Sequence, residues 1–462
     1  STRENCLGQD CPYVKDCFVL AARRTAQESE VVVVNHHLFF ADVMLRDEGL
    51  AELLPTCNTV VFDEAHQLPQ TASLFFGESI STGQLLDLAH DTRNEAIAGA
   101  KDFLPLQDAT RSLEKAARDL RLALPGENQR LGSSQLDELM ELDPALGRLE
   151  DELARFNSVL ESQAERSEGL QHCWERATEL ADRFSRWRLP PGPEIVRWAE
   201  IYSQSASLNA TPLHVAGLFR KQVEGCAKAW IFTSATLAVG RNFSHYCEEL
   251  GLNELDPPIE TALWGSPFNY GEQALLYSPQ GMPDPNSRGY IDAVVEKAFA
   301  AICAARGRTF VLCTSLRAMQ RIHSELESRL EREGFAFPML LQGQGSRSEL
   351  LERFRRLGNA VLVASQSFWE GVDVPGDALS LVIIDKLPFP PPHDPLVQAR
   401  SKELESRGRD PFNDYYLSEA AIALKQGAGR LIRSETDRGL LVITDPRLRQ
   451  MPYGRKLRAA LP

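Results

Sequence analysis

Several common sequence features are missing from this 462-residue chain. No apolar run approaches the roughly 18 residues that a helix needs to cross a bilayer, and no charged-then-apolar leader opens the sequence. It has no internal repeat, no low-complexity tract and no G-x-x-x-x-G-K-[ST] loop, the usual cradle for nucleotide phosphates. We therefore expect a protein without a membrane partner. If the chain has a nucleotide site, that site has to be identified from residues other than a phosphate loop.

An excess of positive charge is also missing. The chain carries 50 Lys+Arg against 64 Asp+Glu, a net charge of −14. This balance excludes a uniformly basic nucleic-acid coat but leaves room for a local basic groove. Much of the acidity lies between Ser81 and Ser205, where 15 Lys+Arg stand against 23 Asp+Glu, a net charge of 15 − 23 = −8.

The nine cysteines, without a secretion signal, indicate a reduced intracellular environment. Six of them stand singly in apolar or helical surroundings and are interpreted as small buried hydrophobic residues. Cys6, Cys11 and Cys17 differ, because they form the pattern C-x4-C-x5-C. Their spacing suits an iron–sulfur cluster, which needs four cysteines. Zinc, which prefers tighter pairs, and no metal at all remain alternatives.

The order of apolar runs predicts an α/β protein. Residues 28–80 contain two strand-like runs, VVVVNHHLFF and TVVFDEAH, whereas residues 81 to about 205 show helix after helix with few strand signals. Strand character returns at AWIFTSATL, and from Gly265 onward strands and helices alternate. Such alternation predicts parallel sheets with crossover helices. We therefore expect two α/β domains, the first interrupted by a helical insertion of about 125 residues.

The stretch VVFDEAHQLP has the pattern of a metal–nucleotide site. Asp63 follows a continuous apolar run, and ligands of parallel sheets bind where strands end. Asp63 would hold the water shell of Mg²⁺, and Glu64 would orient and deprotonate an attacking water. His66 would couple the nucleotide state to neighbouring motifs. The alternative is a strand that ends in solvated acids.

Two further segments are interpreted as parts of the same site. TSAT places Thr233 and Ser234 at another strand end, a weak signal when taken alone. In QGAGRLIRS, Gln426, Arg430 and Arg433 lie at i, i+4 and i+7, and therefore on one face of a predicted helix. Facing a γ-phosphate, these arginines would act as arginine fingers, whereas the alternative is a surface arginine stripe.

The segment AVLVASQSFWEGVDVPG is predicted to be a strand followed by a loop. Ser365, Gln366 and the turn at residues 370–373 are candidates for contact with nucleic acid or nucleotide. Phe368 and Trp369 are either part of that contact or core residues. The following LPFPPPHDP contains five prolines and must be a stiff loop.

Taken together, these motifs resemble those of superfamily 2 helicases of the XPD-like iron–sulfur group, in the bacterial DinG/YoaA branch. DEAH (63–66), TSAT (233–236), LCTS (312–315), SQSFWEGVD (365–373) and QGAGRLIR (426–433) are similar to helicase motifs II to VI. The resemblance implies two RecA-like parallel-sheet motor domains, the first interrupted by a helical arch and a partial iron–sulfur domain. The implied boundaries are 1–27 (iron–sulfur), 28–80 and 208–264 (motor domain 1), 81–207 (arch) and 265–462 (motor domain 2).

The resemblance also assigns roles to residues. It implies that ATP and Mg²⁺ are bound by Asp63, Gly371, Asp373, Gln426, Arg430 and Arg433, with Glu64 and His66 in catalysis. DNA contacts are implied for Thr233, Ser234, Thr314, Ser315, Ser365 and Phe368. Cys6, Cys11 and Cys17 would hold a [4Fe–4S] cluster with a fourth cysteine upstream of Ser1.

The implied activity is ATP-driven 5′→3′ movement on single-stranded DNA and unwinding of forked DNA, in replication and repair. A monomer in the bacterial cytoplasm, associated with the nucleoid and with the chi subunit of the replicative polymerase, would fit this branch. The phosphate loop would lie upstream of Ser1, so we expect the chain alone to be inactive. Two rivals stay open, a DEAH-type RNA helicase and a non-catalytic DNA-binding scaffold. The cysteine triplet counts against the first, and intact Glu64 and Arg433 count against the second.

Overall fold

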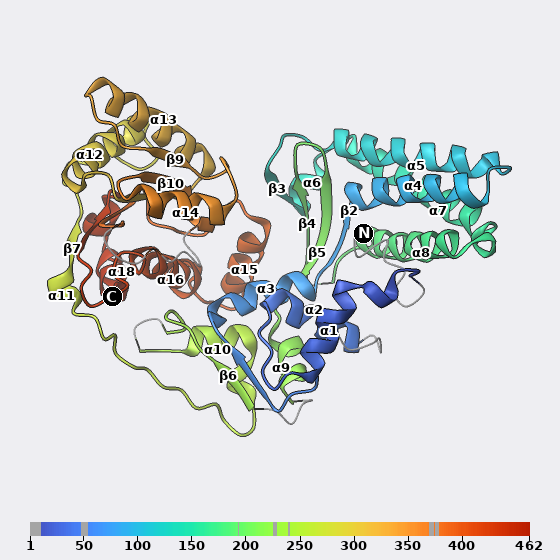
Figure 1. Cartoon of the computed structure of the whole chain (residues 1–462), viewed down its shortest axis with the longest axis horizontal. Coiled ribbons are helices and arrows are strands. Elements are labelled where there is room, and N and C mark those ends of the chain that lie inside the picture. The colour runs from blue at the N-terminus through green and yellow to red at the C-terminus, as the bar shows by residue number, and fades with distance from the viewer. Residues whose placement is uncertain are drawn as a thin grey trace. The chain divides into compact units, whose positions relative to one another are not determined.

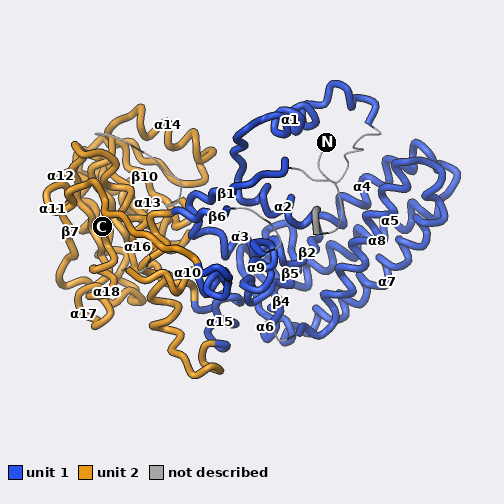
Figure 2. The backbone as a smooth tube through the Cα atoms, turned by 90° about the horizontal axis from the view of Figure 1, so that it is seen from below, with its two compact units in different colours: residues 1–233, 247–258, 392–403 blue, residues 234–246, 259–391, 404–462 orange. Residues whose placement is uncertain are grey.

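The computed structural model describes residues 11–47, 54–192, 194–224, 229–238, 241–368, 374 and 378–462. The chain forms two compact units (Figure 2). Unit 1 comprises residues 1–233, 247–258 and 392–403, and unit 2 comprises 234–246, 259–391 and 404–462. The division therefore falls within two helices, α10 (Ser244–Leu250) and α15 (Pro395–Ser406).

Unit 2 is built on a six-stranded parallel sheet with the order β7-β12-β11-β8-β10-β9 (Figure 1). Its strands are β7 (Ala274–Tyr277), β8 (Thr309–Cys313), β9 (Met339–Leu341), β10 (Val361–Ser365), β11 (Leu381–Ile384) and β12 (Gly439–Ile443). Every residue of β8, β10 and β11 is buried. Their continuous apolar sequences reflect a sheet that is covered on both faces.

Helices cover the two faces of this sheet. On one face α12 (Tyr290–Ala305) and α13 (Leu316–Arg332) share a core with Val311 and Cys313 of β8. On the other, α14 (Arg347–Leu357), α16 (Leu417–Ala428) and α18 (Gly454–Ala460) pack with Phe310 and Leu312. The remaining elements of this unit are α11 (Tyr270–Gln273), η7 (Gln366–Phe368), the π-helix η8 (Phe412–Tyr416) and α17 (Arg447–Gln450). The parallel sheet predicted after Gly265 is thus confirmed.

Unit 1 contains a parallel pair of strands, β1 (Thr59–Phe62) and β6 (Ala229–Phe232), in register from Thr59↔Ala229 to Phe62↔Phe232. Aromatic rings pack on one side of the pair. Phe62 stacks on Phe232 and Trp230, and Phe219 lies against all three. The helices that contribute to this cluster are α2 (His36–Asp47), α3 (Leu68–Phe75) and α9 (Ala216–Glu224).

The insertion between β1 and β6 is a mixed α/β body with its own core. Its sheet is antiparallel, with the order β2-β5-β4-β3. The strands are β2 (Glu78–Ser81), β3 (Gln129–Gly132), β4 (Ile195–Ile201) and β5 (Ala206–Pro212). The long helices are α4 (Thr82–Gly99), α5 (Leu104–Ala123), α7 (Leu142–Glu161) and α8 (Glu168–Arg188). The shorter elements of unit 1 are η3 (Val14–Asp16), α1 (Phe18–Glu28), η4 (Ala65–Gln67), α6 (Ser133–Asp137), η5 (Ala164–Arg166) and η6 (Leu252–Glu254).

Two sequence-based expectations differ from the structure here. The strand-like run at residues 31–40 is not a strand, because Asn35 accepts a hydrogen bond from the N–H of Leu38 (2.7 Å) and so caps α2. The prediction of helix after helix at 81–205 missed the antiparallel sheet, and the boundary predicted at residue 207 falls inside β5. Across the residues that the structure describes, no helix has the length and apolar character needed to cross a membrane.

Gly307 permits a tight approach between the turn before β8 and Asn359. Its φ is +78°, and a Cβ on it would lie 1.9 Å from the carbonyl oxygen of Asn359. We expect Gly307→Ala to lower the free energy of unfolding by about 2–5 kcal/mol, because backbone strain and the clash add. Gly281→Ala is the matched control, since its φ is +73° but no heavy atom lies within 4 Å. It should cost about 1–2 kcal/mol in urea unfolding, and equal losses would contradict this account.

Candidate functional site

Asp63 lies at the end of β1 and is tied to the end of β6. Its Oδ1 accepts hydrogen bonds from the N–H of Glu64 (3.0 Å) and from the hydroxyl of Thr233 (3.3 Å). The N–H of Ala65 donates to the carbonyl of Thr233 (2.9 Å). Two segments that are 170 residues apart in sequence therefore form one polar strand end, as the DEAH and TSAT patterns suggested.

Glu64 and His66 are held together directly after this strand. Glu64 adopts a left-handed backbone, with φ at 49°, which is uncommon for a residue other than glycine. Its Oε2 lies 3.3 Å from Nδ1 of His66, and the His66 side chain is 9% exposed while that of Glu64 is 49% exposed. A largely buried imidazole thus lies beside a solvent-accessible carboxylate, an arrangement compatible with general-base chemistry.

His36, at the start of α2, also touches this cluster and was not predicted as a site residue. It forms a hydrogen bond with the backbone of Asp63, and its ring lies edge-on to Phe62 with centroids 5.9 Å apart. Burial lowers the pKa of His36, and the hydrogen bond to Asp63 opposes that shift only in part. Burial therefore favours the neutral form of this imidazole. The pair of histidines in VVVVNHHLFF was the available sequence signal.

In unit 2, the segment that carries Gln426, Arg430 and Arg433 is not one continuous helix. Helix α16 ends at Ala428, and Gly429 is its C-cap. Gln426 lies in the last helical turn, whereas Arg430 and Arg433 follow in a turn and a loop. The prediction that all three share a helix face is wrong, because the helix stops before Arg430.

The loop after α16 is fixed by Asp437 and Gln273. Oδ2 of Asp437 accepts from the N–H groups of Arg433 (2.8 Å) and Ser434 (2.9 Å), and its Oδ1 accepts from the Ser434 hydroxyl (2.7 Å). Gln273 is 7% exposed and donates to the carbonyls of Ser434 (2.9 Å) and Asp437 (3.0 Å). These two side chains position the backbone of Arg433, and neither was identified from the sequence.

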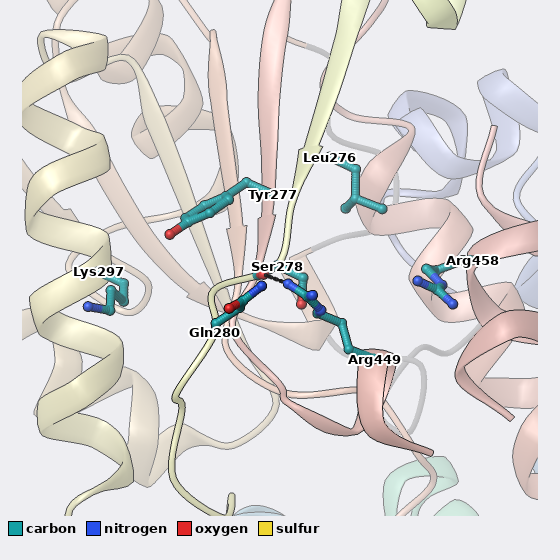
Figure 3. A pocket seen from close by; sticks show the side chains of 7 residues that line it. All are labelled: Leu276, Tyr277, Ser278, Gln280, Lys297, Arg449 and Arg458. Carbon is teal, nitrogen blue, oxygen red and sulfur yellow. Dashed lines mark hydrogen bonds between the residues drawn. The ribbon is translucent and has the colours of Figure 1, made fainter. Parts of the chain in front are cut away.

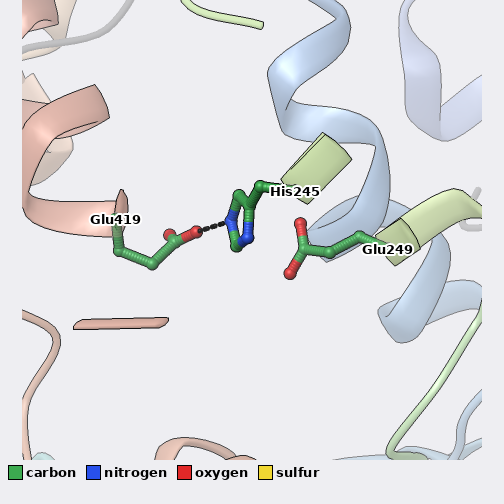
Figure 4. A group of neighbouring side chains, drawn as sticks. All are labelled: His245, Glu249 and Glu419. Carbon is green, nitrogen blue, oxygen red and sulfur yellow. Dashed lines mark hydrogen bonds and ion pairs between the residues drawn. The ribbon is translucent and has the colours of Figure 1, made fainter. Parts of the chain in front are cut away.

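The other end of α16 is anchored by an ion pair. Glu419, in the first turn of the helix, lies 3.1 Å from Nε2 of His245 in α10 (Figure 4). Helix α16 is therefore held at its first turn by this pair, while Asp437 and Gln273 fix the loop that follows its last turn.

Thr314 and Ser315 follow β8 at the carboxyl edge of the six-stranded sheet. The N–H of Thr314 donates to Oδ1 of Asp385 (2.9 Å), and the Ser315 hydroxyl caps α13 by accepting from the N–H of Ala318 (3.2 Å). Asp385 follows β11 and is 1% exposed. In the part of the chain that the structure describes, its Oδ2 has no hydrogen-bond partner. No sequence pattern singled out this carboxyl.

The structure places two predicted DNA contacts in the interior. Phe368 is 4% exposed and belongs to the core beneath α14 and α16. Ser365 is 8% exposed, and its N–H and hydroxyl both donate to Oε1 of Gln342 (2.8 and 3.0 Å). A DNA contact by the Phe368 ring does not fit this burial, so the core alternative holds. Ser234 is half-buried, with its hydroxyl 3.1 Å from the N–H of Thr236.

Three predicted site residues, Cys6, Gly371 and Asp373, lie outside the described residues. Cys11 and Cys17 are thiols at either end of one short turn that contains η3. The N–H of Val14 donates to the carbonyl of Cys11 (2.9 Å), and the N–H of Cys17 donates to that of Val14 (3.3 Å). Backbone hydrogen bonds thus connect the two cysteines through one short turn.

Comparisons with known proteins give similar chains and a similar fold. The family described as Helicase C-terminal domain matches residues 299–462. The whole chain is 43% identical to the ATP-dependent DNA helicase YoaA of Escherichia coli (strain K12), of which it covers 71%. It is 34% identical to the ATP-dependent helicase DinG of Mycobacterium tuberculosis (strain ATCC 25177 / H37Ra), of which it covers 68%. The solved structure of an XPD helicase aligns with 92% of this chain and with 70% of the XPD chain. Its TM-score is 0.56 and its sequence identity is 15%, so the similarity is one of fold.

Asp437→Ala should loosen the loop at Arg433. The substitution leaves two N–H groups and a hydroxyl without their acceptor, which costs about 1–3 kcal/mol of local stability. We expect trypsin to cleave after Arg433 several-fold faster under native conditions, as measured by mass spectrometry of timed digests. Asp410→Ala is the control, because Asp410 caps a different exposed loop through Phe412 and Asn413. Equal cleavage in both variants would show that Asp437 does not hold the loop.

Asp385→Asn should change how stability depends on pH. Burial raises the pKa of Asp385 from its ordinary 3.8 to about 6, although the N–H groups of Thr314 and Lys386 oppose the shift. The folded chain therefore binds an extra proton between these values, and its stability falls as pH rises from about 4 through about 6. Wild type should lose about 3 kcal/mol relative to Asp385→Asn between pH 4 and pH 7.

The measurement is urea unfolding of both proteins at closely spaced pH values. The charged or titratable groups around Asp385 are Lys386, Tyr290 of α12, Cys313 of β8 and the Asp445–Arg447 pair after β12. They are common to both proteins and cancel in the difference. A difference that stays constant across this pH range would show that Asp385 ionises at its ordinary pKa.

Proposed function

Because this chain belongs to the DinG-type family of ATP-dependent helicases, whose fold is XPD-like, we propose that it is the motor portion of a DNA helicase. The proposed activity is 5′→3′ movement along single-stranded DNA, driven by ATP and Mg²⁺, and unwinding of forked DNA. The name of the Escherichia coli relative, which specifies DNA, favours this over the RNA alternative.

The observation that carries the proposal is the polar strand end of Asp63, Glu64, His66 and Thr233. A metal-holding carboxylate and a separately oriented carboxylate stand next to each other, and each has a different partner. A scaffold protein would have no need to hold Glu64 in a left-handed backbone beside a buried imidazole. The geometry therefore supports hydrolysis rather than binding alone.

Each residue has a defined part in the proposed reaction. Asp63, whose carboxylate is kept in place by Thr233, would hold the hydrated Mg²⁺, and the bound ion would neutralise charge on the phosphates. Glu64 would orient the attacking water and take its proton, while His66 keeps the carboxylate in position. His36, in its neutral form, would fix the backbone of Asp63 without adding a competing positive charge.

Arg430 and Arg433 are proposed as the residues that stabilise charge on the transferred phosphoryl group. Arginine fingers act by position, and the backbone that carries Arg433 is fixed by Asp437 and Gln273. Gln426 would contact the nucleotide from the last turn of α16. Gly371 and Asp373 remain proposed nucleotide contacts on sequence grounds alone.

The strand of DNA is proposed to pass along the carboxyl edge of the six-stranded sheet. The exposed Ser315 and half-buried Thr314 lie there, and Thr233 and Ser234 provide hydroxyls in the first motor domain. Roles in replication and repair, association with the chi subunit, a monomeric state and a place at the nucleoid are proposed from the DinG/YoaA resemblance.

The iron–sulfur cluster is proposed on chemical grounds. Cys11 and Cys17 lie at the two ends of one compact turn, Cys6 precedes them in sequence, and a fourth thiolate would come from outside these 462 residues. Such a cluster would stabilise the small domain near the point of strand separation. The measurement is iron content and absorbance near 400 nm in wild type and in Cys11→Ser.

The phosphate loop is proposed to come from a segment beyond these 462 residues. Val61 of β1 and Ile231 of β6 are 59% and 45% exposed, although parallel strands are normally covered on both faces. A further segment that covers this face would end beside Asp63 and bring the phosphate loop to it. We therefore infer that the chain as it stands hydrolyses ATP poorly.

Glu64→Gln should abolish ATP hydrolysis by the protein that includes its upstream reading frame. We expect a loss of at least about 100-fold in strand-stimulated turnover with little change in nucleotide binding, because only the base is removed. The exposed Glu260→Gln is the control and should behave as wild type. The assay is phosphate release with and without single-stranded DNA, and with RNA as the competing polymer.

The possible results separate the candidate functions. Turnover stimulated by DNA and lost in Glu64→Gln would establish the motor and assign the base. Stimulation by RNA alone would favour an RNA helicase. No turnover in any variant, with iron present and DNA still bound, would replace the helicase by a scaffold.

A further inference from the structure

A cavity of about 530 Å³ opens at the end of β7, the edge strand of the six-stranded sheet (Figure 3). Tyr277 and Ser278 come from the strand and its end, and Gln280 comes from the loop after it. Lys297 of α12, Arg449 of α17 and Arg458 of α18 surround them. Its size is that of sites that hold small organic ligands.

The cavity is lined by groups that bind anions. Arg449 is held across the strand end, because its Nη1 donates to the carbonyl of Ser278 (3.2 Å). The hydroxyl oxygen of Ser278 is buried and lacks a hydrogen-bond partner among the residues described. Nζ of Lys297 lies 3.0 Å from Oε1 of Glu296, whose side chain is 60% exposed. A buried polar group without a partner, in the lining of a cavity that also contains three cations, is a group that a ligand can satisfy.

The charge around the cavity is opposite to that of the whole protein. Residues 449–462 contain four cations, Arg449, Arg455, Lys456 and Arg458, and no acid, whereas Arg447 is paired with Asp445. The chain as a whole has a net charge of −14. A basic surface confined to one place in an acidic protein is typical of a local nucleic-acid contact.

The position of the cavity connects it to Thr314 and Ser315. Strands β7, β12, β11 and β8 are consecutive neighbours and run parallel, so their carboxyl ends share one edge. Three strand spacings separate the end of β7 from the end of β8, a distance of about 14 Å. A few nucleotides of an extended single strand cover such a distance.

We propose that this cavity is a phosphate-binding subsite for single-stranded nucleic acid, at the far end of a track that begins at Thr314 and Ser315. Lys297, Arg449 and Arg458 contact phosphates, Gln280 and the Ser278 hydroxyl complete the hydrogen bonds, and the 46% exposed ring of Tyr277 stacks on a base. The inference deepens the proposed DNA-binding function and rests on it.

An acidic protein segment is the competing ligand. It would use the same cations and could add to the open edge of β7, where Leu275 is 68% exposed. The shared carboxyl edge and the ring beside the cations favour a nucleic-acid strand. The two ligands are separated by the experiment.

The test is fluorescence anisotropy of the full chain with a fluorescein-labelled oligo-dT of about 20 nucleotides, titrated at several KCl concentrations. Arg458→Glu should weaken binding about 5–10-fold at low salt. It should also lower the slope of log K against log salt by about 0.7, the value for one phosphate contact on a single strand. Arg455→Glu is the matched control, since Arg455 is exposed on the same helix and does not line the cavity.

Variants of Tyr277 test the same site independently. Tyr277→Ala should weaken binding at every salt concentration without changing the slope, and Tyr277→Phe should restore it, because stacking needs a ring and carries no charge. Cross-linking of the same oligonucleotide with 5-iododeoxyuridine should place an adduct on Tyr277. Thermal unfolding of each variant shows that the fold is retained.

Three results would overturn the proposal in different ways. If Arg458→Glu and Arg455→Glu give the same slope and no adduct forms at Tyr277, the strand does not reach the cavity, while DNA binding itself stands. If polyglutamate of equal charge displaces the oligonucleotide at the same concentration and Tyr277→Ala has no effect, the surface binds acidic protein segments. If wild type does not bind the oligonucleotide at low salt, both this subsite and the proposed DNA-binding function fail.

Discussion

The parallel strands of unit 2 all end at one edge, and the buried carboxyl of Asp385 joins those ends. The carboxyl accepts hydrogen bonds from the N–H groups of Thr314 and Lys386. The hydroxyls of Tyr290 and Thr444 donate to the backbone carbonyl of Asp385. The loops after β8, β11 and β12 are therefore fixed relative to one another by a single residue. Burial makes each of these bonds stronger and makes their loss more costly, so the edge is rigid where a moving strand would need a firm support.

The fold was predictable where burial is complete on both faces. The continuous apolar runs of β8, β10, β11 and β12 predict interior strands of a parallel sheet. The edge strand β7 was missed, because Leu275 and Tyr277 are exposed and the run is only four residues long. The valines before Asn35 were misread because residue composition favoured a strand, whereas one side-chain cap starts α2 immediately after them.

The contact between Asp63 and Thr233 was predictable from the sequence, whereas the side chains that support the loop at Arg433 were not. Asp63 and Thr233 stand in short patterns at strand ends, so their meeting follows from a parallel pair. Gln273 is separated from Ser434 by 161 residues, and no local pattern relates them. The end of α16 at Ala428, before Arg430, was not predicted from the sequence. Long-range hydrogen bonds and helix ends are decided by tertiary packing, which periodicity does not contain.

The left-handed backbone of Glu64 lowers the stability of the protein at a residue whose side chain has a proposed role in hydrolysis. Holding φ at 49° in a residue with a Cβ costs about 1–3 kcal/mol, and glycine would relieve most of it. Glycine at this position would therefore make the protein more stable, whereas the proposed hydrolysis would require the carboxylate. The strain at Glu64 is thus a cost that only a function of its side chain would justify.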